Sequence, residues 1–158
     1  MKKTTQFIVK AAVIGTLYAL LTLILSPFSY GVMQVRFSEA LTVLALYTPA
    51  AIPGLTVGCF FANFLGSNGI VDAVIGSLAT LLGTGAMFLL RRHKIPAPLA
   101  NVLSNAVLVG WMLWKWSGVP FGMAACMFWV GLGELISCFV LGIPLIRLLD
   151  RRGKDLGL

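Results

Sequence analysis

The sequence predicts an all-α integral membrane protein with six transmembrane helices and both termini in the cytoplasm. Of its 158 residues, 59% are hydrophobic and only 11% are charged, and the mean hydropathy is +0.96. Soluble domains use about a quarter of their residues for Asp, Glu, Lys and Arg, so this chain cannot cover itself with a polar surface in water. Its apolar runs are also longer than the alternating strands of about ten residues in a membrane β-barrel.

Six apolar runs fill most of the chain. A helix needs roughly 20 residues to cross the hydrocarbon core, so six helices take about 120 residues and leave fewer than about 40 for loops and ends. This length excludes a soluble catalytic or nucleotide-binding domain and predicts a single transmembrane domain over residues 1–158. The expected helices lie at residues 6–25, 36–48, 50–65, 70–90, 96–116 and 121–149.

The second run is the weakest of the six. Residues 36–48 would form a helix of only roughly 20 Å, too short to cross a membrane alone, so we expect this helix to begin nearer Val32. The first run has a basic start, as a signal peptide has, but it is long for one and no small-residue cleavage site follows closely. We therefore expect it to remain as the first helix. A five-helix alternative would place the basic clusters on opposite sides of the membrane.

The basic residues form three groups, and the net charge of +7 is better explained by membrane topology than by nucleic acid binding. With six crossings, the two ends and the loop after the fourth helix lie on one side. By the positive-inside rule that side is the cytoplasm. The three groups are Lys2, Lys3 and Lys10; Arg91, Arg92 and Lys94; and Arg147, Arg151, Arg152 and Lys154.

Three charged residues fall within or near the apolar runs, where a charge costs about 2.5 to 3.5 kcal/mol on insertion scales. Arg36 and Glu39 are three residues apart and would share one helix face, where they could pair with each other. Either this pair holds the first loop, or Glu39 faces a polar cavity that Arg36 closes. Glu134 has no Lys or Arg within one turn. It is either a ligand-binding carboxylate or a neutral, hydrogen-bonded acid of the core.

Other polar residues have both a structural and a functional interpretation. Asn63 can form an interhelical hydrogen bond or contact a ligand, and Asp72 in the first turn of the fourth helix is favoured there by the helix dipole in either case. Trp111 is deep enough to stack on a flat ligand. The fifth helix also carries a polar stripe, which faces other helices or a cavity rather than lipid: Asn101, Ser104 and Asn105.

The residues for several other chemistries are missing from the apolar runs. His93, the only histidine, lies in a basic loop, so we expect no metal site and no enzyme. No glycine-rich phosphate motif is present, so an ATPase that drives transport must be another chain. No cofactor is expected. The cysteines are interpreted as buried small hydrophobic residues: Cys59, Cys126 and Cys138.

Small residues recur every four positions in the first helix, at Ala11, Gly15 and Ala19. Such a ridge permits close approach of another helix, which can belong to the same chain or to a partner.

Taken together, five segments resemble the QueT family. This resemblance implies a six-helix S component of an energy-coupling factor transporter in the bacterial plasma membrane. It also implies a 7-deazaguanine queuosine precursor as substrate, and a transmembrane T component with two cytosolic ATPases as partners. The segments are QVRFSEALT (34–42), TPAAIPG (48–54), GC (58–59) with AN (62–63), GSLAT (76–80) and VGLGE (130–134).

The resemblance also suggests roles for the candidate residues. Glu39 and Glu134 would bind the guanine edge and a cationic arm, in an order that the sequence leaves open, with Asn63 and Asn105 assisting. The ridge at Ala11, Gly15 and Ala19 resembles the S-component docking motif. We therefore expect Gly15→Leu to abolish complex formation and to leave ligand binding intact. The alternative is a small stand-alone proton-coupled transporter or channel in which Glu134 carries the proton.

Overall fold

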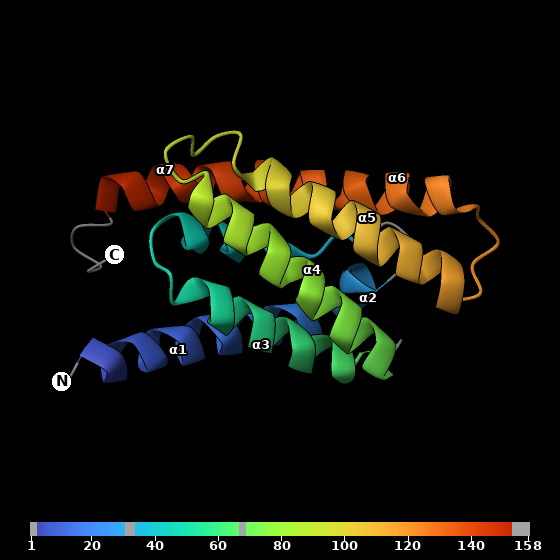
Figure 1. The fold of residues 1–158 in the computed structure, drawn as a ribbon, viewed down its shortest axis with the longest axis horizontal. Helices are drawn as coiled ribbons and strands as arrows, with labels where there is room; N and C mark the ends of the chain where they lie inside the picture. Colours follow the sequence, from blue (N-terminus) through green and yellow to red (C-terminus); the bar gives the residue numbers. More distant parts are fainter. Residues whose placement is uncertain (1–2, 31–33, 67–68, 153–158) are drawn as a thin grey trace.

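The computed structural model describes residues 3–30, 34–66 and 69–152, and these ranges contain helices and no strand (Figure 1). The long helices run side by side along the longest axis of the molecule. In chain order the elements are α1 (Lys3–Ile24), α2 (Ser26–Ser29), η1 (Phe37–Leu46), α3 (Ala51–Phe64), α4 (Gly69–Leu89), α5 (Pro98–Trp116), α6 (Met123–Leu135), η2 (Ile136–Leu141) and α7 (Gly142–Arg152).

The helices pack in an order that follows the chain. α1 packs on α3, α3 on α4, α4 on α5 and α5 on α6, while η1 lies in the middle and contacts most of them. Three helices of the described ranges are long and apolar enough to cross a membrane: Lys3–Ile24, Gly69–Leu89 and Met123–Arg152. η1 and α3 are apolar but shorter. Six crossings therefore stay a prediction.

Proline and glycine set several helix ends. Pro98 stands in the first turn of α5, where its missing N–H has no helical partner to lose. The predicted start at Pro96 was two residues too early. Gly69 and Gly118 have φ angles of 59° and 62°, a left-handed conformation that glycine adopts without steric cost. They mark the start of α4 and the turn after α5.

The second predicted helix differs most from the structure. η1 is a 3-10 helix of ten residues that begins at Phe37. A start near Val32 lies outside the described residues, but Gln34 has a φ of 43° and Arg36 is extended, with φ −95° and ψ 103°. Arg36 therefore precedes the helix. The predicted face shared by Arg36 and Glu39 is wrong, because it requires both residues to be helical.

α6, η2 and α7 form one continuous helix of 30 residues. η2 is a π-helical segment within it, and such segments are often found at functional sites. The segment follows Glu134 directly. It places Ser137 and Cys138 in the interior.

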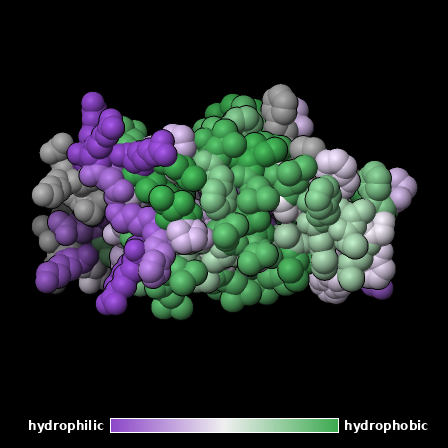
Figure 2. Space-filling view, turned by 90° about the horizontal axis from the view of Figure 1, so that it is seen from above, coloured by the Kyte–Doolittle hydropathy of each residue, from purple (hydrophilic) through white to green (hydrophobic). Residues whose placement is uncertain are grey.

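Most of the basic residues in the described ranges gather toward one end of the molecule. In Figure 1 the start of α1, the α4–α5 connection and the end of α7 lie toward the same end. Figure 2 shows hydrophilic residues collected there and a hydrophobic band beside them. Exposed apolar side chains such as Ile8, Leu103 and Val140, each at least 60% exposed, belong to a lipid-facing surface. The location of this basic end on the cytoplasmic side of the membrane stays a prediction.

α1 and α3 cross at very short distance through glycine. A Cβ atom at Gly15 would lie 2.5 Å from the carbonyl oxygen of Gly54, and one at Gly58 would lie 2.9 Å from Gly15 Cα. Part of the ridge on α1 is therefore used inside the chain. Because Gly15 is buried in this crossing, Gly15→Leu would disturb the fold itself, so the expectation that it leaves binding intact does not fit this packing.

Candidate functional site

A cluster of polar side chains lies inside the bundle, between apolar layers. Its centre holds Glu39 and Glu134, here called the carboxylate pair, and each side chain is at most 1% exposed. Tyr18 donates a hydrogen bond to Glu39 Oε1. Asn101 Nδ2 lies 3.0 Å from Glu39 Oε2 and 3.5 Å from Glu134 Oε2. One amide group of α5 thus bridges two carboxylates that come from η1 and α6.

Asn101 can reach the carboxylate pair because α4 has no side chain at Gly83. A Cβ atom there would lie 2.8 Å from Asn101 Cα and would collide with the amide oxygen Oδ1. The amide nitrogen of Asn101 faces the carboxylate oxygens, which can accept its hydrogen bonds, and the amide oxygen faces α4. Gly83 therefore provides the space in which Asn101 takes this orientation.

The η2 segment completes the centre of the cluster. Cys138 Sγ lies 3.7 Å from Glu134 Oε2 and 3.7 Å from Asn101 Nδ2. Thr42 donates a hydrogen bond of 2.6 Å to the backbone oxygen of Glu39. Cys138 is buried, as predicted, but it contacts the carboxylate pair and is not only a small hydrophobic residue.

A second group of charged and polar side chains lies at the start of η1 and α4. Arg36 Nη2 is 3.8 Å from Asp72 Oδ1, so the ion-pair partner of Arg36 is Asp72 and not Glu39. Asn63 Nδ2 donates to the backbone oxygen of Asp72 at 3.2 Å and lies 3.3 Å from Cys59 Sγ. The interhelical hydrogen bond predicted for Asn63 is therefore present.

Buried acids outnumber buried bases here. Glu39, Glu134 and Asp72 are each at most 1% exposed, and Arg36 is the buried basic side chain beside them. Within the described ranges, neither member of the carboxylate pair has a basic side chain within 4 Å. Unpaired buried carboxylates are costly, so the cluster is suited to a cation or to a ligand with several N–H donors.

An apolar layer separates the cluster from the basic end of the molecule. It joins η1, α4 and α7 with the α4–α5 connection through buried side chains: Val43, Leu46, Met87, Ala97, Ile146 and Leu149. A second apolar group packs α4, α5 and α6 farther along these helices, around Val109 and Met112. The polar cluster is therefore enclosed.

Two predicted site residues lie apart from the carboxylate pair. Trp111 is 38% exposed, and its ring packs edge-on against Trp116 with 5.0 Å between centroids. Asn105 is buried, but its amide donates to the backbone oxygen of Asn101 at 3.1 Å. The structure thus brings Glu39, Glu134, Arg36, Asp72 and Asn63 into the cluster, leaves Asn105 at its edge and places Trp111 on the surface.

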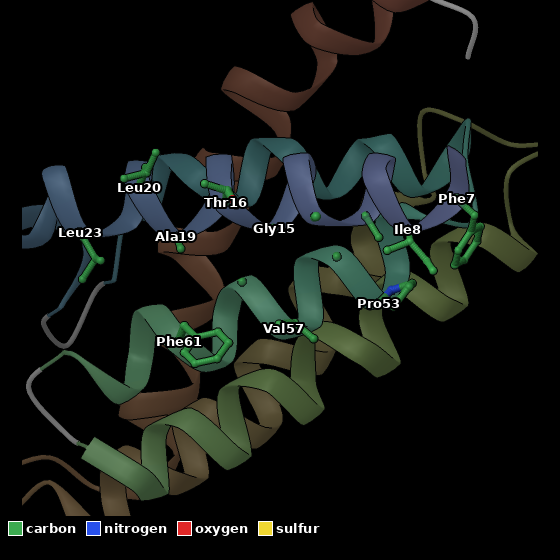
Figure 3. A pocket seen from close by; sticks show the side chains of 14 residues that line it. Phe7, Ile8, Gly15, Thr16, Ala19, Leu20, Leu23, Pro53, Val57 and Phe61 are labelled. Atoms are coloured by element: carbon green, nitrogen blue, oxygen red, sulfur yellow. The ribbon is translucent and has the colours of Figure 1, made fainter. Parts of the chain in front are cut away.

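An apolar groove of about 570 Å³ runs between α1 and α3. Figure 3 shows Thr16 and Leu20 of α1 and Val57 and Phe61 of α3 along it. The small residues of the predicted ridge line it as well: Ala11, Gly15 and Ala19. Gly15 belongs to both the internal crossing and the groove floor.

Comparison with known proteins shows the family to which this chain belongs. The QueT transporter family matches residues 8–151, most of the chain. The chain belongs to the QueT transporter family. An 85-residue segment is also 41% identical to the Queuosine precursor transporter QueT of Lactococcus lactis subsp. cremoris (strain MG1363). That segment is 52% of this chain and only 50% of the length of that relative. No solved structure matches.

Membership of the QueT transporter family and the apolar helices make this chain a multi-pass membrane protein. Membership also confirms the resemblance inferred from the five sequence segments. Three of these segments carry charged or amide residues of the cluster: the first contains Arg36 and Glu39, and the other two contain Asn63 and Glu134.

Proposed function

We propose that this chain is the substrate-binding S component of an energy-coupling factor importer in the bacterial plasma membrane, and that its substrate is a 7-deazaguanine queuosine precursor. The carboxylate pair carries this proposal. It consists of two fully buried acids, Glu39 and Glu134, bridged by Asn101 and lacking a basic side chain within 4 Å in the described chain. Family membership and the name of the Lactococcus relative support the substrate class.

The chemistry of such a precursor fits the cluster. 7-Aminomethyl-7-deazaguanine has a flat ring, an edge with several N–H donors and a cationic arm. One carboxylate can accept two hydrogen bonds from the ring edge, and the other can pair with the ammonium group. Asn63, Asp72 and Arg36 lie beside the pair, and Asn105 supports the Asn101 backbone. Trp111 has no role in this proposal because its ring is on the surface.

Access to the cluster is proposed from the end opposite to the basic residues. The layer around Val43, Met87 and Ile146 closes the basic side. Polar residues instead continue toward the other end, where α3 ends near Asn63 and α4 begins near Asp72. Because the cluster is almost unexposed, the helices must separate there before a ligand binds.

Ligand binding by the purified chain tests the proposal directly. We expect it to bind 7-aminomethyl-7-deazaguanine, with weaker binding of the analogue whose arm ends in a methyl group, because that analogue lacks the cation. Calorimetry measures both affinities, and mass spectrometry identifies any compound that copurifies. Absence of binding by well-folded protein would contradict the proposal. Uptake by the chain alone in liposomes with a proton gradient would favour the stand-alone transporter instead.

ATP hydrolysis is assigned to two cytosolic ATPases, joined to this chain through a transmembrane T component. The groove between α1 and α3 is the proposed docking face, because it is apolar and its floor is formed by small residues such as Ala11 and Ala19. A helix of the partner can therefore approach the backbone closely.

Thr16→Trp should reduce copurification with the T component and leave ligand affinity unchanged. Thr16 is exposed and lines the groove, so a large ring there fills the space without entering the crossing at Gly15. Val13→Trp is the matched control, since Val13 is 53% exposed on α1 and lies outside the groove lining. Pull-down from detergent measures the complex. Equal recovery of the T component with both variants would exclude this docking face.

A further inference from the structure

The guanidinium group of Arg36 is buried with a donor that the described residues do not satisfy. The side chain is 1% exposed, and its Nε donates to the backbone oxygen of Ser29 at 3.3 Å. Nη2 lies 3.8 Å from Asp72 Oδ1, beyond hydrogen-bonding distance, and has no hydrogen-bond partner among the described residues. Buried donors are nearly always paired, and an unpaired charged donor is especially costly. The arrangement calls for an acceptor from outside the chain.

The groups around Arg36 hold the guanidinium in place from several sides. Its Cζ lies 5.8 Å from the centre of the Tyr30 ring, and Asp72 provides the opposite charge. Cation–ring contacts and ion pairs of this kind orient a guanidinium without using all five of its N–H groups. Nη2 is therefore fixed in position while it remains free to donate.

Glu39 offers the complementary group next to Arg36. Its backbone N–H donates to the Arg36 carbonyl oxygen at 3.0 Å, so the two residues belong to one tight turn. The Glu39 carboxylate accepts from Tyr18 and Asn101. A carboxylate has about four acceptor positions, so Glu39 can accept further hydrogen bonds. A buried cationic donor and a buried anionic acceptor thus come from one turn of the chain, outside ion-pair distance of each other.

We infer that Arg36 and Glu39 together recognise the pyrimidine edge of the 7-deazaguanine. Arg36 Nη2 donates to the ring carbonyl oxygen, Glu39 accepts the neighbouring N–H groups, and Glu134 is left for the cationic arm. This assignment rests on the proposed function and gives each carboxylate one role. It also predicts specificity. In a ring with an amino group in place of the carbonyl, the N–H donors of that amino group would face the N–H donors of Arg36, and no hydrogen bond could form. Sites built around such hydrogen bonds reject mismatched ligands strongly.

The test pairs one change in the ligand with one change in the protein. The 6-thio analogue replaces the carbonyl oxygen with sulfur, a weaker acceptor, and keeps every N–H group. We expect the parent protein to bind the oxo ligand about tenfold more tightly than the thio analogue, the effect of one charge-assisted hydrogen bond. In Arg36→Met, this preference should disappear, while the preference for the aminomethyl arm over a methyl arm remains.

Glu134→Gln is the reciprocal variant. It should keep the oxo-over-thio preference and lose the preference for the cationic arm. Each comparison uses two ligands on the same preparation, so partial unfolding of a variant cancels out. If Arg36→Met does not fold, Arg36→Gln tests the same point, because its neutral amide donates a weaker hydrogen bond and should reduce the preference.

The outcomes separate this inference from the proposed function. An oxo-over-thio ratio that is the same in the parent and the Arg36 variant would overturn the role of Arg36, while binding of the oxo ligand would still support the proposed function. A parent protein that binds neither ligand would overturn both.

Discussion

Replacing either member of the carboxylate pair with glutamine should weaken binding of 7-aminomethyl-7-deazaguanine by about tenfold to a hundredfold. Hydrogen bonds to charged groups are worth about 1.5 to 3 kcal/mol each, and Glu39 and Glu134 are both buried where water cannot substitute for them. Glutamine keeps the shape of the side chain. It removes the charge and places an amide donor where Asn101 Nδ2 already donates. Calorimetry on purified Glu39→Gln and Glu134→Gln proteins measures the loss.

Asp150→Asn is the matched control for these two variants. Asp150 is also an acid within a helix, but its side chain is 45% exposed and pairs with Lys94 toward the basic end. The same loss of charge there should leave ligand affinity within about twofold, because exposed ion pairs contribute little. Parent-like affinity in both glutamine variants would exclude the carboxylate pair as the binding site.

Gly58→Ala should strongly lower the thermal stability of the protein. The new Cβ atom would lie 2.9 Å from Gly15 Cα and closer still to the Gly15 carbonyl oxygen, and these backbone atoms cannot rotate away. α1 must then separate from α3. Overpacking of this kind costs typically about 1 to 3 kcal/mol and sometimes more. A thiol-reactive fluorophore can follow unfolding in detergent, since Cys59, Cys126 and Cys138 are all buried.

Gly85→Ala provides the comparison, because a Cβ atom at Gly85 meets nothing within 4 Å. Both changes replace glycine with alanine inside a helix, so the gain in helix propensity of up to about 1 kcal/mol is shared. The difference between the two unfolding temperatures therefore reports the crossing alone. Similar temperatures for both variants would mean that α1 and α3 tolerate a wider separation.

The sequence predicts the long helices well because their signals are local. Apolar runs bounded by glycine, proline or basic residues place α1, α3 and α4 within a few residues of their observed ends. The 3-10 geometry of η1 is not visible in this way, since it depends on packing between α1, α4 and α7. No local sequence pattern distinguishes a short 3-10 helix from a short α-helix.

The sequence predicts only part of the site, because only some of its residues have a local signal. Charged residues in apolar runs stand out, so Glu39 and Glu134 could be chosen from the sequence. Their partners Tyr18 and Asn101 are 21 and 62 residues from Glu39, and only the fold brings them together. A phenol within an apolar helix and the amide stripe on α5 were the available signals. Trp111 shows the opposite error, because depth along a helix does not determine the face on which a residue lies.

The π-helical segment at Ile136–Leu141 sets the rotational register between two halves of the last helix. One residue of an α-helix corresponds to about 100° of rotation, and a π turn inserts such a residue. Glu134 before the segment and Ile146 after it both face inward, Glu134 toward Asn101 and Ile146 into the apolar layer. A single inserted position in the chain thus lets one helix contribute a member of the carboxylate pair along one stretch and part of the apolar layer along the next.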